Sequence, residues 1–274
     1  MSEHAPVGTL EGWTRSPFTG GGLTYDVYRR GSGPGVVLIP EIPGITPEVL
    51  GLAEHLVLSG FTVAVPSPFG TPGRPASAGY TVGTVARLCV ASEFRAFAVG
   101  ASRPITGFLR ALAADLADRT PGNGAGVIGM CFTGGFALAT AVDGSVTAAV
   151  ASQPAAPFPV SRRHRADPTM SPAEFDQVAE RAARGDVCAL GLRFSHDGSV
   201  PAERFRTLSD RLGDAFRVIE IDSGPGNPGG FSRAAHSVLT SEVRERPGHP
   251  ARQARDEVVA FLRERLDPDG VADR

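Results

Sequence analysis

The 274-residue sequence has few cysteines, little uncompensated charge and no long apolar runs. Its three cysteines are Cys89, Cys131 and Cys188, and so sparse and odd a set argues against a disulfide framework and for a reducing compartment. The formal net charge of −2 leaves no basic footprint for nucleic acid or a membrane surface. No stretch approaches the roughly 18 apolar residues of a membrane span, and the first residues lack the pattern of a signal peptide. We therefore expect a cytoplasmic protein that binds neither nucleic acid nor membranes.

What the sequence does contain is enough apolar residues, 42% of the total, for a sizeable core. Short apolar runs alternate with segments of helical periodicity, which predicts an α/β protein with a mostly parallel central sheet and helices on both faces. Because no linker interrupts this pattern, we expect a single domain over residues 23–274 after a loose, glycine-rich leader over residues 1–22. Residues 66–100 and 152–186 are expected to form loops or insertions that shape a pocket.

The predicted elements follow from this alternation. Strands are predicted over 23–29 (an edge strand), 35–40, 61–65, 126–130, 146–151, 187–194 and 216–221. Helices are predicted over 47–59, 104–117, 136–142, 172–184, 201–212 and a C-terminal segment that includes 258–266. Residues 66–82 are expected to form a long loop, and residues 83–100 stay ambiguous.

The segment 126–135 is the most informative part of the chain. An apolar run ends in the pattern Gly-x-Cys-x-x-Gly around Cys131, and an apolar, alanine-rich stretch follows. This is the strand–turn–helix pattern of a nucleophile elbow, with cysteine in place of the usual serine. A helix N-terminus favours a thiolate, which is the nucleophilic form of cysteine. The alternative interpretation is a buried structural cysteine beside glycines needed for packing.

An activated cysteine needs a base, and the base needs a residue that orients it. In an open α/β sheet such groups meet beyond the carboxyl ends of the strands. Of the six histidines, only His196 and His236 come after a strand in this way, and Asp197 follows the strand 187–194. The order Cys131, Asp197, His236 matches nucleophile, acid and base in the α/β-hydrolase fold. Taken singly, the aspartate could be a turn residue and the histidine an exposed loop residue.

Glu41 is a fourth candidate, because it directly follows the apolar run 35–40. The loop at this place corresponds to the oxyanion-hole loop of an α/β-hydrolase, so the backbone N–H groups of Ile42 and Phe132 could hold an oxyanion. A carboxylate beside a thiolate is unfavourable. Glu41 is therefore protonated or turned away, or it partners the thiol at rest and releases it on substrate binding. The alternative is an ordinary solvent-facing glutamate.

Two other patterns do not predict a site. Residues 124–129 match Gly-x-Gly-x-x-Gly, but a polar stretch precedes them and the strand comes afterwards, so they do not fit a dinucleotide fingerprint. Cys89 and Cys188 have no metal-ligand spacing to each other or to Cys131, and both are expected to be core residues. We expect no metal site.

From about Tyr25 to Leu266, the sequence resembles the dienelactone hydrolase family, a cysteine-based branch of the α/β-hydrolases. The resemblance is carried by Pro40-Glu41-Ile42-Pro43-Gly44, Gly129-Met130-Cys131-Phe132-Thr133-Gly134-Gly135, His196-Asp197-Gly198-Ser199-Val200-Pro201 and Ala235-His236-Ser237.

This resemblance implies a role for each of the four candidates. Cys131 would be the nucleophile, His236 the base, Asp197 the residue that orients it, and Glu41 the carboxylate that gates the thiol. It also implies hydrolysis of a small lactone or carboxylic ester through a thioester intermediate, without a metal or organic cofactor.

The sequence departs from the family pattern at two positions. Thr133 stands where the type member has glycine, and Thr240 stands where it has the arginine that grips the substrate carboxylate. A carboxylate clamp could have moved to the basic cluster of Arg162, Arg163 and Arg165, or the substrate could lack a carboxylate. These five residues are the candidate substrate contacts.

Two other functions remain open. The chain could be a binding protein of hydrolase fold whose triad is incomplete or blocked by Thr133. It could also be a thiol redox sensor that uses Cys131, although no resolving cysteine lies nearby in the sequence. Both a monomer and a homodimer are compatible with the sequence.

Overall fold

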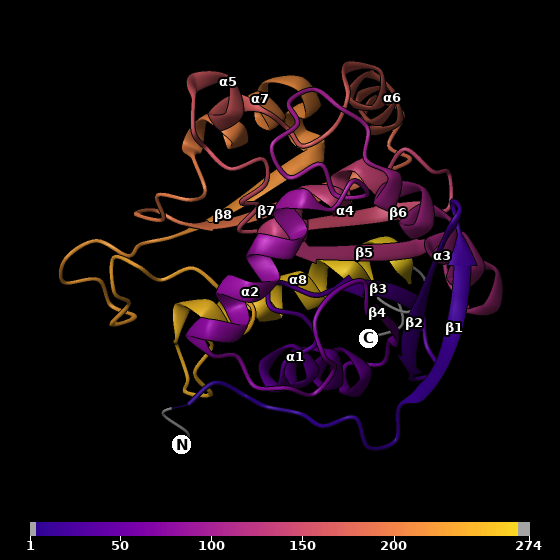
Figure 1. Ribbon diagram of the computed structural model, residues 1–274, viewed down its shortest axis with the longest axis horizontal. Helices are drawn as coiled ribbons and strands as arrows, with labels where there is room; N and C mark the ends of the chain where they lie inside the picture. Colours follow the sequence, from indigo (N-terminus) through magenta and orange to yellow (C-terminus); the bar gives the residue numbers. More distant parts are fainter. Residues whose placement is uncertain (1–3, 268–274) are drawn as a thin grey trace.

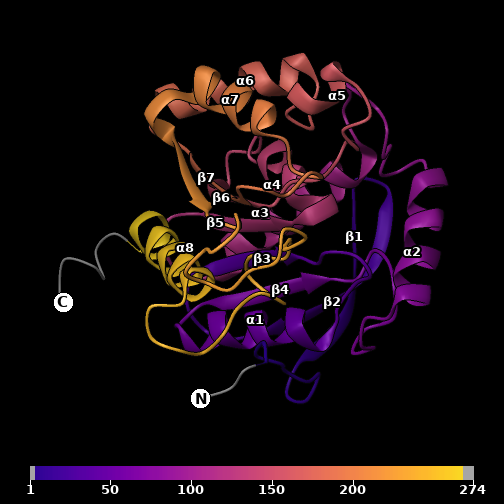
Figure 2. The same ribbon diagram turned by 90° about the vertical axis from the view of Figure 1, so that its left-hand side faces the viewer.

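An eight-stranded sheet lies at the centre of the structure, with helices on both of its faces (Figure 1, Figure 2). The structure is a computed structural model that describes residues 4–267. Residues 1–3 of the expected leader and residues 268–274 of the expected domain lie outside the described residues.

The elements follow one another in an alternation of strands and helices. The strands are β1 (Thr14–Gly20), β2 (Leu23–Arg30), β3 (Gly35–Ile39), β4 (Thr62–Pro66), β5 (Ala125–Met130), β6 (Val146–Ser152), β7 (Cys188–Phe194) and β8 (Phe216–Ile221). The helices are α1 (Pro47–Leu58), α2 (Ala78–Val90), α3 (Pro104–Arg119), α4 (Gly134–Thr140), α5 (Arg162–Ala166), α6 (Pro172–Ala183), α7 (Ala202–Leu212) and α8 (Pro250–Leu266). Two short 3₁₀ turns, η1 (Cys131–Thr133) and η2 (Gly213–Ala215), complete the set.

The strand order is β1-β2-β4-β3-β5-β6-β7-β8. Strands β3 to β8 pair in parallel, while β1 with β2 and β2 with β4 pair antiparallel. The mostly parallel sheet with helices on both faces is the α/β-hydrolase architecture that the sequence predicts.

The sheet separates two apolar cores, and β3 shows why. Its side chains alternate between the faces of the sheet, so Val37 and Ile39 contribute to one core and Val36 and Leu38 to the other. Helices α3 and α4 contribute to the first core, and α1 and α8 to the second. Burial on both faces explains why β3 is an unbroken apolar run in the sequence.

The expectation of a loose leader over residues 1–22 is wrong for its second half. Residues 14–20 form β1, which pairs with β2 along its whole length, so the sheet edge is β1 and not the strand predicted over 23–29. The two strands are joined at Gly21 and Gly22, which have φ of 56° and 79°. Such angles suit a tight hairpin turn that only glycine adopts easily.

The expected loop over residues 66–82 is also shorter than predicted, because α2 begins at Ala78. Ser77 caps this helix by accepting a hydrogen bond from the Tyr80 backbone N–H. The helix extends to Val90, so the first part of the ambiguous stretch 83–100 is helical and the rest is irregular. Among residues 4–267, no helix combines the length and apolar character needed to span a bilayer.

Candidate active site

The backbone turns sharply where β5 ends and η1 leads into α4. Cys131 stands at this turn with φ of 53°, a strained value for a residue with a Cβ. The turn also needs glycine around it. A Cβ at Gly129 would lie 2.3 Å from the Thr133 carbonyl oxygen, and a Cβ at Gly135 would lie 2.2 Å from the Thr169 side chain. The chain therefore adopts the strand–turn–helix geometry that the sequence predicts for an elbow.

Thr133 does not contact a substrate space, which corrects the expectation from the sequence. It is fully buried, and its hydroxyl accepts a hydrogen bond from the Met130 backbone N–H at 3.0 Å. The same hydroxyl lies 3.2 Å from the Pro40 carbonyl oxygen, to which it can donate. The threonine thus joins the elbow to the loop that follows β3, and the segments that carry Ile42 and Phe132 lie side by side.

Asp197 and His236 come together beyond the ends of β7 and β8. The His236 Nδ1 and Asp197 Oδ2 atoms are 2.5 Å apart, and the aspartate is 8% exposed. The other carboxylate oxygen accepts hydrogen bonds from the Ser199 hydroxyl at 2.6 Å and the Ser199 backbone N–H at 2.9 Å. The Cys131 side chain lies close enough to His236 to raise the pKa of its imidazole. The sequence-predicted cysteine, aspartate and histidine therefore lie together, with a hydrogen bond joining the aspartate to the histidine.

The electrostatics of the site favour a charged imidazole on His236. Burial by itself lowers the pKa of His236, but the hydrogen bonds and charges of Asp197 and Cys131 outweigh it and raise the pKa to about 11. Burial similarly raises the pKa of Asp197, and the hydrogen bonds from His236 and Ser199 outweigh it and hold that pKa below its usual value. The imidazolium beside the Asp197 carboxylate is the form of His236 that these contacts stabilise.

Glu41 is buried, with 6% exposure, and is therefore not the solvent-facing residue of the alternative interpretation. Its Oε2 atom accepts hydrogen bonds from the Ser237 hydroxyl at 2.8 Å and the Gln153 amide at 3.2 Å. Its Oε1 atom accepts one from the Thr240 hydroxyl. The carboxylate is thus engaged by three donors from two other segments of the chain.

Thr240 is correspondingly not a substrate contact, because it is 1% exposed and donates its hydroxyl proton to Glu41. It stands at the position of the arginine that the resemblance predicts for gripping the substrate, but its hydroxyl is hydrogen-bonded to the buried Glu41 carboxylate.

The basic cluster lies on α5 and is partly engaged elsewhere. Arg165 forms an ion pair with Glu203 at 2.9 Å, while Arg162 and Arg163 are exposed. Within residues 4–267, no hydrogen bond or ion pair joins these arginines to Cys131 or His236.

Three polar residues of the site escape the sequence prediction. Ser199 and Ser237 lie next to the predicted acid and base, within segments already recognised. Gln153 directly follows β6, so the same strand-end argument that selects Asp197 could have selected it. It is fully buried with φ of 36°, a second strained residue beside the site.

A buried arginine holds the loop between β6 and α6. Arg204 of α7 is 1% exposed and donates to the carbonyl oxygens of Pro154, Pro157, His164 and Asp167. Burial lowers its pKa to about 10, so the side chain stays charged at neutral pH. This loop begins next to Gln153, and Arg204 therefore fixes one wall of the site.

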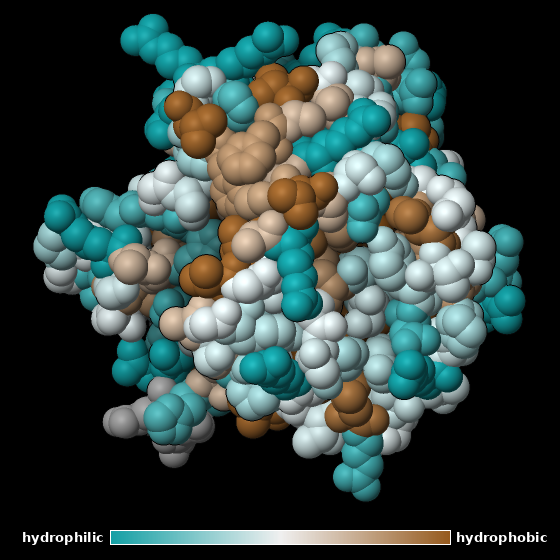
Figure 3. Space-filling model, viewed as in Figure 1, coloured by the Kyte–Doolittle hydropathy of each residue, from teal (hydrophilic) through white to brown (hydrophobic). Residues whose placement is uncertain are grey.

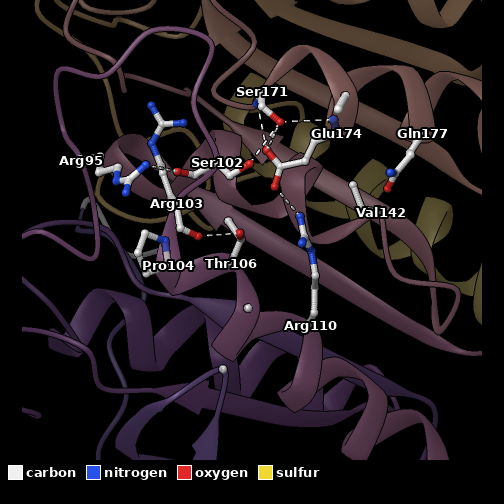
Figure 4. Close-up of a pocket in the computed structure, with 13 residues that line it drawn as sticks. Arg95, Ser102, Arg103, Pro104, Thr106, Arg110, Val142, Ser171, Glu174 and Gln177 are labelled. Carbon is white, nitrogen blue, oxygen red and sulfur yellow. Dashed lines mark hydrogen bonds and ion pairs between the residues drawn. The ribbon is translucent and has the colours of Figure 1, made fainter.

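A separate hollow of about 610 Å³ lies between α3 and α6 (Figure 4). Its polar side chains pair with one another. Arg110 binds Glu174 at 2.7 Å, Ser171 caps α6 through the same glutamate, and Arg95 donates to the Ser102 carbonyl oxygen. The described residues that line it include no member of the Cys131 site. Within residues 4–267, no group of three or more His, Cys, Asp or Glu side chains is arranged to hold a metal ion.

Comparison with solved structures shows the same fold in several hydrolases. A protein of Klebsiella pneumoniae that is named as a dienelactone hydrolase shares 16% identity at a TM-score of 0.61, over 91% of this chain and 97% of the other. A dienelactone hydrolase-like promiscuous phosphotriesterase from metagenomic libraries shares 17% at a TM-score of 0.61, over 93% and 98%. The dienelactone hydrolase of Anabaena variabilis shares 14% at a TM-score of 0.57, over 93% and 98%. At these identities the likeness shows the fold alone.

No curated protein sequence matches the chain. The sequence profile of the dienelactone hydrolase family, in contrast, matches residues 24–264, which is nearly the whole chain. The strained cysteine at the end of β5 and the aspartate and histidine beyond β7 and β8 stand within this match. The chain belongs to the dienelactone hydrolase family.

Proposed function

We propose that the protein hydrolyses a small lactone or carboxylic ester with Cys131, His236 and Asp197 as its catalytic triad, through a thioester intermediate. The observation that supports this most strongly is the hydrogen bond between Asp197 and His236 beside a cysteine, in a strained elbow, that raises the pKa of the histidine. The strained backbone at Cys131 and the raised pKa of His236 are both expected of a nucleophile that lies beside a proton donor.

In the first step, the Cys131 thiolate attacks the carbonyl carbon and a carbon–sulfur bond forms. The carbonyl oxygen becomes an oxyanion, which the backbone N–H groups of Ile42 and Phe132 would bind. The carbon–oxygen bond to the leaving alkoxide then breaks, and the His236 imidazolium gives this oxygen its Nε2 proton. The products of this step are an alcohol, or the opened lactone, and a thioester on the enzyme.

In the second step, the neutral His236 accepts a proton from water, and the resulting hydroxide attacks the thioester carbonyl. The carbon–sulfur bond breaks, the acid leaves, and the thiolate–imidazolium pair returns. Asp197 keeps the Nδ1 side of the ring facing itself, so the Nε2 side faces the reaction.

Glu41 has a different place in this mechanism from the one that the resemblance implies. Three donors hold its carboxylate at rest, so we assign it to positioning the segment that carries His236 and Ser237. The Thr133 side chain is buried and hydrogen-bonded to the backbone of the elbow, which argues against a site that this threonine blocks.

The test is hydrolysis of p-nitrophenyl acetate and a panel of enol lactones. Wild-type protein is compared with Cys131→Ala, Cys131→Ser and the control Cys89→Ala, which changes a half-buried cysteine on α2. We expect turnover to disappear in Cys131→Ala, to fall strongly in Cys131→Ser, and to persist in Cys89→Ala. Turnover that survives Cys131→Ala would overturn the proposed mechanism.

A further inference from the structure

Large apolar side chains are exposed on the face of the molecule that carries α2. Val82 and Val90 on α2 are 69% and 84% exposed, Phe97 in the following loop is 47% exposed, and Val160 before α5 is 69% exposed. Figure 3 shows apolar side chains gathered over the C-terminal end of α2 and the loops between α2 and α5. Such a gathering on a surface is a usual mark of a binding site.

A series of aromatic contacts links Phe97 on this surface to the elbow. The Phe97 ring lies 5.3 Å from the Phe158 ring, and the Phe158 ring lies 6.1 Å from the Phe132 ring. Phe132 directly follows Cys131 and is fully buried. The Phe97 carbonyl oxygen also lies 3.2 Å from His164 Nε2, which ties the loop after α2 to α5. These ring contacts therefore lead from the exposed Phe97 to the buried Phe132, and both Cys131 and Phe158 pack against the same apolar core.

Among the residues expected to grip a substrate carboxylate, Thr240 and Arg165 are engaged elsewhere, while Arg162 and Arg163 lie exposed on α5. Thr240 replaces the family's arginine and binds Glu41, and Arg165 is paired with Glu203. The described contacts thus favour an uncharged, apolar group beside Cys131 over a carboxylate.

We propose that the surface formed by Phe97, Phe158 and Val160 is an acyl-chain site, which binds the apolar chain of an ester whose carbonyl is attacked by Cys131. This inference rests on the proposed function and names its substrate class: esters with a medium-length aliphatic acyl group. The acyl chain of the substrate would cover the exposed parts of these three side chains. Complete burial of a methylene group corresponds to roughly a fourfold gain in affinity, so contact on one side gives about twofold for each methylene.

The test is kcat/KM for p-nitrophenyl acetate, butyrate and octanoate. We expect a rise of about tenfold or more from acetate to octanoate in the wild type, because methylene groups become covered. The double variant Phe97→Ser, Val160→Ser keeps its acetate activity and loses most of that rise. Phe97 is 47% and Val160 69% exposed, so folding is expected to persist. The control Val218→Ser, at an equally exposed apolar position on β8, leaves the rise intact.

Binding of the same esters to Cys131→Ala, measured by calorimetry, separates this inference from the proposed function. The acyl-chain site is supported, even if turnover fails, when octanoate binds more tightly than acetate. This difference in affinity must be lost in the double variant Phe97→Ser with Val160→Ser and kept in Val218→Ser. Equal binding of the two esters, or no effect of the double variant, would overturn the site even if Cys131-dependent turnover is observed.

Discussion

Replacing Glu41 by glutamine tests whether this carboxylate positions the site or gates the thiol. In the structure it accepts hydrogen bonds from Ser237, Thr240 and Gln153 while nearly all of it is buried. A glutamine has the same shape but carries no charge, and its amide nitrogen must face one of these donors.

The expected cost follows from those three bonds. Hydrogen bonds to a charged group contribute about 1.5–3 kcal/mol each and neutral ones about 0.5–1.5 kcal/mol, so three bonds lose roughly 3 kcal/mol together. The neutral side chain also avoids the cost of burying a charge, which offsets part of this lost free energy. We therefore expect Glu41→Gln to lower the free energy of unfolding by about 1–3 kcal/mol. Glu257→Gln, at an exposed position on α8, should stay within about 0.5 kcal/mol of wild type.

The assay is urea denaturation followed by circular dichroism, together with the rate of Cys131 alkylation by iodoacetamide. Thr240→Val removes one donor and should cost about 1–2 kcal/mol, and the double variant should lose less than the two single losses combined, because the partners are shared. The alkylation rate should stay within about threefold of wild type in Glu41→Gln, a change of about 0.6 kcal/mol. If stability is unchanged while alkylation accelerates tenfold or more, Glu41 partners the thiol at rest and our assignment is wrong.

Three further positions give predictions of the same kind. Asp197→Asn should lower kcat by about 10²–10⁴-fold, because the ring of His236 loses its orienting charge. The pKa of Asp197 is lower in the folded protein than the value of about 3.8 in the unfolded chain, so the ionised carboxylate stabilises the fold above that pH. This stabilisation is lost as the pH falls through the lower, folded pKa. The stability of Asp197→Asn should therefore fall less steeply below about pH 4 in an acid titration. Gly135→Ala places a Cβ 2.2 Å from Thr169 and should lower the free energy of unfolding, measured by urea denaturation, by about 2 kcal/mol or more. In the control Gly144→Ala the new Cβ meets no atom within 4 Å, so the free energy of unfolding should not fall in this way. Equal losses in the two variants would show that crowding at Gly135 has no effect. Arg204→Met leaves four carbonyl oxygens without their donor and should cost about 3–5 kcal/mol, with faster proteolysis of the loop over 153–167; unchanged proteolysis would show that the loop does not depend on it.

The proximity of Cys131, Asp197 and His236 could be predicted because these residues follow the ends of strands in a parallel sheet. Apolar runs of β5 and β7 are recognisable in the sequence, and the carboxyl ends of such strands meet at one edge. Cys131 follows β5 directly and Asp197 comes three residues after the end of β7, so topology places both at this edge. His236 required one more step, since an irregular stretch of 14 residues separates it from β8.

Residues whose role depends on side-chain direction could not be placed in this way. Thr133 looks like added bulk beside the nucleophile in the sequence, but its hydroxyl turns back to the backbone of the elbow. Thr240 and Ser237 reach Glu41 across roughly 200 residues of sequence, and no local pattern records that contact. β1 was missed for another reason: its residues are polar and half exposed, and the Gly21-Gly22 turn was the signal that could have found it.

The most direct test of the central claim is mass spectrometry of the protein mixed with p-nitrophenyl acetate and quenched in acid within the first turnover. The mechanism predicts an acetyl group on the peptide that contains Cys131, absent in Cys131→Ala, and accumulating further in His236→Asn if that variant still forms the thioester. Turnover without any acyl group on Cys131, or an acyl group on a different side chain, would contradict the account.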